Sequence, residues 1–285
     1  MILVDMNQIT IASIMAESKG KPSYDENLIR HIILNVIHSI RQKHSAKYGE
    51  IILCYDGKGS WRKKIFQYYK ANRKKNREDS DFDWKQLFDF LTKVRLELSE
   101  YLPYKVLYHE DCEADDIIAS LSMAYGKEVP ILIVSSDTDF IQLQTLPKVE
   151  QYSPIMKKFL RESNPEKYLF EHILRGDSSD GIPNYLSDDD ILVTEGKRQR
   201  PVSAKKVDMQ WSAITAGQSM TFETNKEEVN FNRNKSLIDL SCIPDTYREE
   251  ILNMYRNTPD RDNSKIMDYF MKNGMKHMMS LITEF

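Results

Sequence analysis

The chain has 285 residues, a formal net charge of −3, 41% hydrophobic residues and 29% charged residues, which describe a globular protein of one large or two smaller domains. No apolar run approaches the roughly 20 residues that a membrane-spanning helix needs. The sequence begins directly with Ile2–Val4 and has no basic leader, so we expect a protein of the cytoplasm. Cys54, Cys112 and Cys242 lack metal-type spacing, which fits a reducing compartment and argues against zinc.

Three short apolar runs, at residues 2–4, 51–55 and 131–134, are each followed within three residues by an aspartate: Asp5, Asp56 and Asp137. Such runs, separated by helical stretches, predict buried strands of a parallel sheet, to which residues 104–108 add another strand and residues 149–152 a weaker candidate. We therefore predict an α/β fold with a mostly parallel central sheet flanked by helices. The carboxyl ends of parallel strands meet at one edge of a sheet, so the aspartates are expected to lie together.

Helical periodicity fills the spaces between these strands and dominates the second half of the chain. A capping box at Ser23–Glu26 predicts the start of a helix that continues through Ile40. Further helices are predicted at about residues 61–77, 83–98, 168–175, 227–240, 246–255 and 265–282. Residues 188–217 show no convincing period and predict a loop. We place a domain boundary near Arg175, between an α/β domain (1–175) and a helical region (176–285).

Acidic residues recur where strands end and helices begin. Glu113, Asp115 and Asp116 open a helix, Asp137 and Asp139 flank Thr138, and Asp177 and Asp180 lie three residues apart. The candidate metal ligands are Asp5, Asp56, Glu113, Asp115, Asp116, Asp137, Asp139, Asp177 and Asp180. Carboxylate oxygens select Mg²⁺ or Mn²⁺ over zinc. Their number predicts two ions, which about 4 Å apart stabilise the attacking and leaving oxygens of a phosphoryl displacement.

Each acidic group also has a simpler interpretation. Asp111 and Glu113 could cap a helix and complement its dipole. The aspartates at positions 5, 56, 177 and 180 could each belong to a solvated turn. The coincidence of three strand ends with the Asp137–Asp139 pair favours a metal site over these separate explanations.

A basic segment follows Asp56 directly. Between Gly57 and Arg77 there are nine basic residues and no acidic one, interleaved with aromatic residues. Basic side chains bind phosphates and aromatic rings stack on unpaired bases, so the candidate nucleic-acid ligands are Arg62, Lys63, Lys70, Arg73, Lys74 and Lys75. The alternative is a solvated helix with Trp61, Phe66 and Tyr69 packed inward. A second patch, comprising Lys197, Arg198, Arg200 and Lys205, is either a phosphate contact or a surface loop.

Several of these motifs, in this order, resemble the flap endonuclease (5′-nuclease) family, particularly the ribonucleases H of T-even bacteriophages. They are Leu3–Asp5, Cys54–Asp56, Tyr69–Arg73, Glu113–Asp116, Ser135–Asp139 and Gly176–Asp180. The resemblance implies a PIN-like nuclease core, a helical arch at about residues 57–80 and a helix-hairpin-helix region after Asp180. That region is atypical here, because Gly181–Asn184 runs into Tyr185–Asp190 without the family's second glycine turn.

The resemblance also implies roles for individual residues. Asp5, Asp56, Glu113, Asp115 and Asp137 would surround a first metal ion, and Asp139, Asp177 and Asp180 a second, with Asp116 assisting through water or hydrogen bonds. Lys70 and Arg73 would grip the scissile phosphate, with Asp115 and Asp137 as the central catalytic carboxylates. The implied protein is a monomeric, Mg²⁺-dependent 5′→3′ exonuclease and flap endonuclease, with Mn²⁺ able to substitute. It would also act on RNA–DNA hybrids and meet a phage single-stranded-DNA-binding protein in the host cytoplasm.

Two other classes of function stay open from the residues alone. A catalytically silent protein could bind DNA structures and use the ions only as bridges. A phosphatase or phosphotransferase could form an aspartyl-phosphate, although such an enzyme would not explain the aromatic and basic segment.

Overall fold

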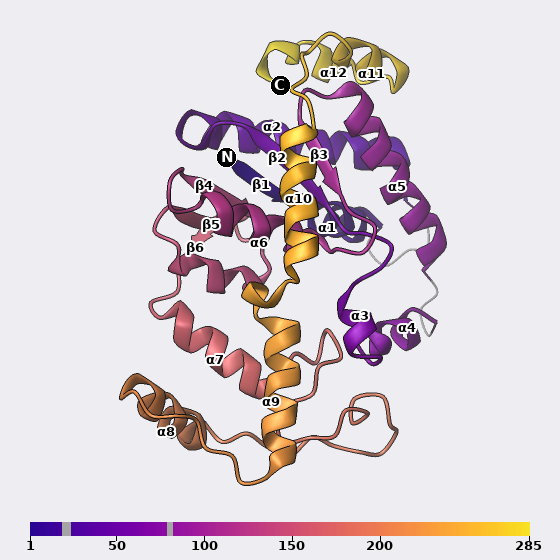
Figure 1. The fold of residues 1–285 in the computed structure, drawn as a ribbon. Helices are drawn as coiled ribbons and strands as arrows, with labels where there is room; N and C mark the ends of the chain where they lie inside the picture. Colours follow the sequence, from indigo (N-terminus) through magenta and orange to yellow (C-terminus); the bar gives the residue numbers. More distant parts are fainter. Residues whose placement is uncertain (19–23, 79–81) are drawn as a thin grey trace. The chain divides into compact units, whose positions relative to one another are not determined.

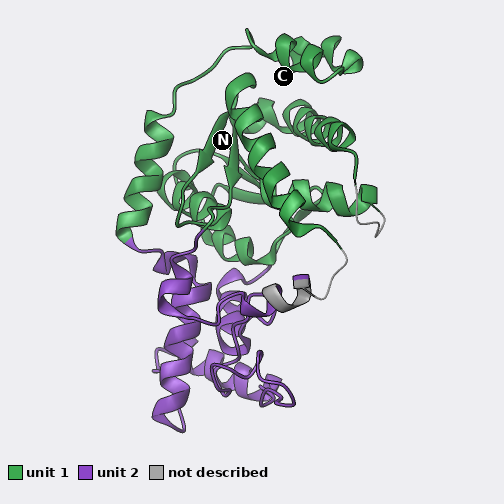
Figure 2. Ribbon diagram, turned by 90° about the vertical axis from the view of Figure 1, so that its right-hand side faces the viewer, with its two compact units in different colours: residues 1–58, 81–161, 245–285 green, residues 59–80, 162–244 purple. Residues whose placement is uncertain are grey.

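The computed structural model describes residues 1–18, 24–78 and 82–285, and the side chains of residues 74–76 and 78 are outside that description. The chain forms two compact units, coloured separately in Figure 2. Unit 1 comprises residues 1–58, 81–161 and 245–285, and unit 2 comprises residues 59–80 and 162–244. Each unit is made of segments that are separated in the sequence. The predicted domain boundary near Arg175 stays a prediction. Within the described ranges, no helix is both long and apolar enough to cross a bilayer.

Unit 1 is built on a six-stranded sheet of order β3-β2-β1-β4-β5-β6 (Figure 1). The strands are β1 (Ile2–Asp5), β2 (Ile51–Tyr55), β3 (Lys105–Tyr108), β4 (Ile131–Val134), β5 (Val149–Ser153) and β6 (Lys158–Leu160). The first five are parallel, and β6 pairs with β5 in the antiparallel direction. Every residue of β1, β2 and β4 is buried, as expected for strands covered on both faces. The prediction of a mostly parallel sheet is therefore confirmed, and β6 adds a short edge strand.

The helical elements of unit 1 are α1 (Met6–Ser18), α2 (Glu26–Tyr48), α5 (Trp84–Tyr101), α6 (Ala114–Tyr125), η1 (Thr138–Thr145), α10 (Asp245–Asn257), α11 (Ile266–Lys272), α12 (Lys276–Met279) and η3 (Ile282–Glu284). One hydrophobic core joins side chains of β1, β2 and β4 to those of α2, α5 and α11. Helix α6 packs against β1 to β4 and against α10. Helices thus enclose the sheet, which places its functional groups at the strand ends.

Two details at the start of unit 1 differ from the predictions. Helix α1 begins directly after Asp5 and was not predicted, because its buried face includes threonine and serine while Met15 is exposed, so the sequence shows no apolar stripe. The N-cap of α2 is Asp25, whose Oδ1 accepts hydrogen bonds from the amides of Asn27 (2.8 Å) and Leu28 (3.2 Å). The predicted cap, Ser23, lies outside the described residues.

Unit 2 consists of α3 (Arg62–Ile65), α4 (Ala71–Glu78), α7 (Pro165–Arg175), α8 (Ala204–Thr215), α9 (Asn225–Ile238) and η2 (Leu240–Cys242). The prediction of one helix over residues 61–77 is wrong, because the chain leaves the helix after Ile65 and Lys70 has a left-handed backbone with φ of 58°. The prediction of a loop throughout residues 188–217 is also wrong, since α8 occupies its second part. Residues 265–282 form two short helices rather than one.

Gly57 lies two residues after β2, and its backbone contacts the loop that leads into α6. Its amide donates a hydrogen bond of 2.7 Å to the carbonyl of Cys112. A Cβ atom at this position would lie 2.2 Å from the carbonyl oxygen of His109 and 2.4 Å from that of Glu110. Only glycine permits this approach, which holds Asp56 beside the start of α6.

We predict that Gly57→Ala lowers the free energy of unfolding by roughly 3 kcal/mol, because backbone atoms rather than flexible side chains must move. The matched control is Gly274→Ala, at a glycine with φ of 65° that ends α11 and has no atom within 4 Å of the added methyl group. The control is expected to cost only about 1 kcal/mol, from its left-handed backbone. Urea denaturation measures both values, and equal costs would contradict the close approach at Gly57.

Candidate metal centre

The order of the sheet reverses at β1, which has β2 on one side and β4 on the other. Val4 is the register partner of both Leu53 and Val134. The end of β1 therefore lies between the ends of its two parallel neighbours, at the position where open α/β sheets bind ligands. The chain carries Asp5 at this point, and Asp56 and Asp137 follow the neighbouring strands. Parallel pairing thus brings the three strand-end aspartates to one edge.

The electrostatics of Asp5 show how close these carboxylates are. Asp5 is only 6% exposed and accepts hydrogen bonds from the Gln8 amide (3.1 Å) and the Ser135 hydroxyl (3.0 Å). Burial, reinforced by the negative charges of Asp56 and Asp137, raises the pKa of Asp5 to about 7, and the two hydrogen bonds only partly oppose this. The charged form of Asp5 is therefore costly near neutral pH.

Asp56 connects the strand ends to α6. Its Oδ1 accepts a hydrogen bond of 2.8 Å from the backbone amide of Ala114, the first residue of that helix. Its Oδ2 accepts one of 2.7 Å from the side-chain amide of Asn7. The amino end of a helix carries partial positive charge, which favours a carboxylate there. Asp56 is thereby oriented from two sides.

The first turn of α6 adds acidic groups to the same region. Glu113 is the N-cap and is 7% exposed, and its backbone amide donates a hydrogen bond of 2.9 Å to the carboxylate of Asp116. Asp116 is fully buried. Glu113 and Asp116 form a capping box, so the helix-capping interpretation of Glu113 holds, whereas Asp111 precedes the helix. Asp115 lies in this turn and is half-buried.

Asp137 and Asp139 open the 3₁₀ helix η1 after β4. Asp137 is its N-cap, and its Oδ1 accepts a hydrogen bond of 3.0 Å from the amide of Asp139. The amide of Asp137 donates to the hydroxyl of Ser135 at 3.1 Å. Both carboxylates are half-buried at the carboxyl edge of the sheet. One oxygen of Asp137 is thus fixed by its own turn.

In unit 2, Asp180 is surrounded by donors. Its Oδ2 accepts a hydrogen bond of 2.9 Å from the Tyr69 hydroxyl and lies 3.4 Å from Lys70 Nζ, while its Oδ1 pairs with Arg73. The amide of Lys70 also donates to the carbonyl of Asp180 at 2.7 Å. The two cations predicted to grip a phosphate are therefore paired with a predicted metal ligand. This pairing holds the start of α4 against the loop at residues 176–182.

Asp177 lies in the same loop and closes a turn. Its Oδ1 accepts hydrogen bonds of 2.8 Å from both the amide and the hydroxyl of Ser179. Its Oδ2 lies 3.9 Å from Nε2 of His172, at the end of α7. Sequence reasoning did not single out His172, and its position five residues before Asp177 gives no recognisable spacing.

The basic segment keeps its aromatic rings inside unit 2. Trp61, Phe66 and Tyr69 are each 5% exposed or less, so the expectation that these rings stack on bases is wrong and the inward-packed alternative holds. Arg62 is also buried, donates to the carbonyl of Leu237 at 2.8 Å and stacks on Trp61. Its predicted contact with nucleic acid is therefore corrected to a structural role.

Other predicted nucleic-acid ligands have different surroundings. Lys63 is exposed, as are Arg198, Arg200 and Lys205, whereas Lys197 pairs with Asp190 at 3.1 Å. The side chains of Lys74 and Lys75 lie outside the described part of the chain.

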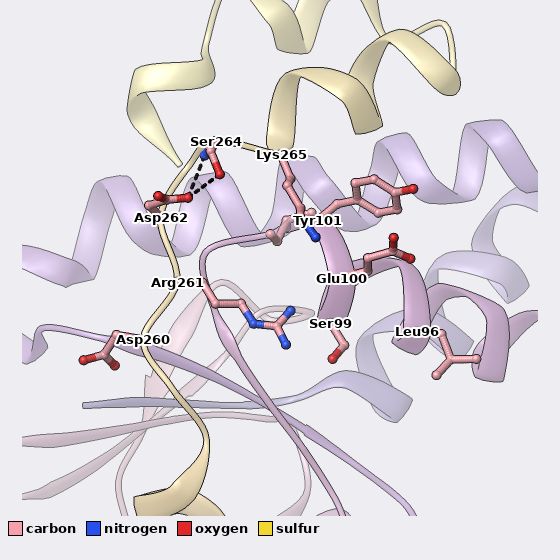
Figure 3. Close-up of a pocket in the computed structure, with 10 residues that line it drawn as sticks. Leu96, Ser99, Glu100, Tyr101, Asp260, Arg261, Asp262, Ser264 and Lys265 are labelled. Carbon is pink, nitrogen blue, oxygen red and sulfur yellow. Dashed lines mark hydrogen bonds between the residues drawn. The ribbon is translucent and has the colours of Figure 1, made fainter.

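A separate cleft of about 810 Å³ lies between the end of α5 and residues 260–265, and Figure 3 shows its lining. Arg261, Lys265, Glu100 and Asp260 all line this cleft, although Figure 3 shows the Asp260 carboxylate turned away from the Arg261 guanidinium. Asp262 accepts hydrogen bonds from the amide and hydroxyl of Ser264 at 3.0 and 2.5 Å. Charges of both signs alternate here, so this cleft does not offer the one-signed set of oxygen ligands found at the sheet edge.

Comparison with protein families places this arrangement in a known class. Residues 1–171 match the family described as "5'-3' exonuclease, N-terminal resolvase-like domain", and residues 163–285 match "T4 RNase H, C terminal". The chain belongs to this 5′–3′ exonuclease family and is a nuclease of that type.

Individual relatives agree with this assignment. Ribonuclease H of Enterobacteria phage T4 is 34% identical over 99% of this chain and 95% of its own length. A 5′–3′ exonuclease of Buchnera aphidicola is 29% identical over 53% of each chain. Two solved structures share the fold at 19% identity: the T5 D15 protein with metal ions (TM-score 0.63, 89% of this chain and 98% of that one) and T5 5′-exonuclease with zinc (TM-score 0.64, 97% and 98%).

We predict that Asp5→Asn stabilises the metal-free protein above pH 7 by roughly 1–3 kcal/mol, because the amide removes a buried charge. The pKa of Asp5 is raised from 3.8 to about 7 by folding. In wild type, the free energy of unfolding should therefore fall as pH rises between these values, where the unfolded state releases a proton that the folded state keeps. Above pH 7 the cost is present in full.

Urea denaturation in a chelator, from pH 4 to pH 8, measures this effect. Asp89→Asn, at an exposed position on α5, is the control and should change the free energy of unfolding little at any pH. A loss of stability in Asp5→Asn at pH 8 would contradict the repulsion described above.

Proposed function

We propose that this protein is a magnesium-dependent 5′→3′ nuclease that hydrolyses phosphodiester bonds in RNA–DNA hybrids, duplex 5′ ends and 5′ flaps. The main support is the convergence of Asp5, Asp56 and Asp137 with the acidic start of α6. Like charges gathered around the buried carboxylate of Asp5 are costly unless cations accompany them.

The residues fit a hard divalent cation. The carboxylates supply only oxygen ligands, and Mg²⁺ prefers to share its shell between a few carboxylates, water and phosphate oxygens. When bound, such ions supply an activated water and neutralise the leaving oxygen of an in-line displacement. The use of two ions, with Asp139, Asp177 and Asp180 at the second, is a proposal carried by the family resemblance.

The chain's own groups have definable tasks in this proposal. Asn7 and the amide of Ala114 orient Asp56, and Gln8 and Ser135 orient Asp5. Fixed carboxylates present their oxygens without reorganisation at the moment of reaction. In unit 2, Lys70 and Arg73 are kept together by Asp180, which preorganises two cations for a phosphate.

The substrates and partners in this proposal are inferred from the names of similar proteins. Similar proteins are described as a ribonuclease H and a 5′–3′ exonuclease, and the T5 D15 protein, which shares the fold, as a flap endonuclease with DNA and metal ions. We propose that this chain removes RNA primers during phage-type DNA replication in the host cytoplasm. A phage single-stranded-DNA-binding protein is the proposed protein partner.

A substrate panel tests the proposal against a non-catalytic DNA-structure binder. Labelled RNA–DNA hybrid, nicked duplex and 5′-flap substrates are incubated with the protein in Mg²⁺ or in a chelator. A nuclease releases short products only with the metal ion, whereas a structural binder shifts the substrates and leaves them intact.

We predict that Asp137→Ala lowers the rate of flap cleavage by more than about 100-fold, because it removes a central ligand oxygen. Binding of the flap, measured by fluorescence anisotropy, should be unchanged or tighter because one negative charge is gone. Asp89→Ala removes an exposed carboxylate and should cleave like wild type. Full activity of Asp137→Ala would refute the assignment of this residue.

We predict that Arg73→Ala slows flap cleavage about 10-fold and lowers the salt dependence of binding by about one unit of slope, the value for one phosphate contact. Anisotropy titrations at several salt concentrations measure the slope. Arg256→Ala removes an exposed arginine at the end of α10 and serves as the control. An unchanged slope in Arg73→Ala would mean that this side chain makes no phosphate contact and serves contacts within the protein, such as those to Asp180 and Ser179.

A further inference from the structure

A single hydroxyl joins the ends of β1 and β4. Val4 and Val134 are register partners, so the next residues, Asp5 and Ser135, leave the two strands side by side and on one face. Ser135 is fully buried. Its Oγ donates to Oδ2 of Asp5 at 3.0 Å and accepts from the amide of Asp137 at 3.1 Å. The two carboxylate-bearing strand ends are thereby connected through one side chain.

Gln151, on the neighbouring strand β5, holds the backbone around that hydroxyl. Its side chain is 1% exposed, and its Nε2 donates to the carbonyls of Ser135 (3.1 Å) and Asp137 (2.6 Å). Its Oε1 accepts a hydrogen bond of 3.2 Å from Gln144. An amide nitrogen has two donors, and here each serves one carbonyl of the same turn. This arrangement restrains the peptide units that carry Asp137.

Gln8 restrains the same turn from α1. Its amide donates to Oδ1 of Asp5 at 3.1 Å, and its side-chain Oε1 accepts from the amide of Ser136 at 2.6 Å. Both oxygens of Asp5 are therefore hydrogen-bonded to groups that also contact the end of β4. A buried network with its polar groups satisfied in this way is rigid and specific.

We propose that Ser135 and Gln151 are positioning residues that fix Asp137 relative to Asp5 and so set the affinity of the site for its divalent cation. This proposal rests on the proposed function of the carboxylate cluster. Like charges repel, so carboxylates without the link would separate and would have to be drawn together again when the cation binds. Groups that orient metal ligands in this manner typically change metal affinity 10- to 100-fold when they are removed.

Two adjacent serines allow a matched test. Ser135→Ala deletes the linking hydroxyl, whereas Ser136→Ala deletes a hydroxyl that bonds Oγ of Ser153 at 2.6 Å. Titration calorimetry with Mn²⁺ on the folded, metal-free protein measures affinity without any reaction. We expect Ser135→Ala to raise the dissociation constant about 10-fold, and Ser136→Ala to raise it less than 3-fold. Cleavage by Ser135→Ala should recover as Mn²⁺ is raised, which a general loss of structure would not produce.

Gln151→Met provides a second, independent variant. Methionine has a similar length but no donors, and Gln144→Met is its control because that change removes the outer hydrogen bond to Oε1 of Gln151 and keeps the two bonds from Gln151 to the carbonyls. Gln151→Met should weaken Mn²⁺ binding about 10-fold and Gln144→Met less than 3-fold. Thermal melting shows whether each variant is folded at the temperature of the titration. If Gln151→Met is unfolded there, Ser135→Ala decides the test.

The outcomes separate the two proposals. If wild type binds Mn²⁺ and cleaves while Ser135→Ala and Ser136→Ala have equal dissociation constants, the positioning role is overturned and the proposed function stands. If wild type neither binds Mn²⁺ nor cleaves, the proposed function itself fails.

Discussion

Repulsion among carboxylates at one edge of the sheet is the constraint around which unit 1 is organised. Parallel pairing delivers Asp5, Asp56 and Asp137 to the same place, and burial makes the charge of Asp5 costly. Backbone amides, hydroxyls and the amino end of α6 stabilise the carboxylates, but together they offset only part of that cost. In the proposed function a divalent cation would offset the remainder, so the affinity for the ion would come from the folded arrangement of these carboxylates.

The sequence predicts the elements whose residues are nearly all apolar and buried. Strands β1, β2 and β4 are enclosed on both faces, so they read as unbroken apolar runs that end on an acidic residue. Helix α1 escapes prediction because its buried face carries polar as well as apolar residues. Helix α8 escapes because its apolar residues face a small local core that includes Val207 and Trp211. The segment between α3 and α4 could not be foreseen, since nothing local to Lys70 signals its left-handed backbone.

The residues of the site likewise include some that the sequence predicts and some that it does not. Strand-end carboxylates are predictable because the topology of a parallel sheet fixes where strands end. Their partners are not, because the contacts of Asn7 and Gln151 depend on register and on side-chain packing between distant segments. Composition also does not show which way a side chain points, because aromatic residues beside lysines are equally compatible with stacking on bases and with packing inward. The burial of Trp61 and Phe66 settles that choice in favour of the protein's own core.

The interleaving of the two units has a consequence for biosynthesis. Core residues of unit 1 include Tyr269 and Phe270 of α11, which share a hydrophobic cluster with Ile2 and Val4 of β1. The ribosome makes residues 245–285 only after all of unit 2 has been translated. Domains usually fold in the order in which they are synthesised. Here the strands of the sheet are synthesised first, but the helices of residues 245–285 that complete their core are synthesised last. The apolar side chains of these strands therefore have to be kept from aggregating while unit 2 is made and folds.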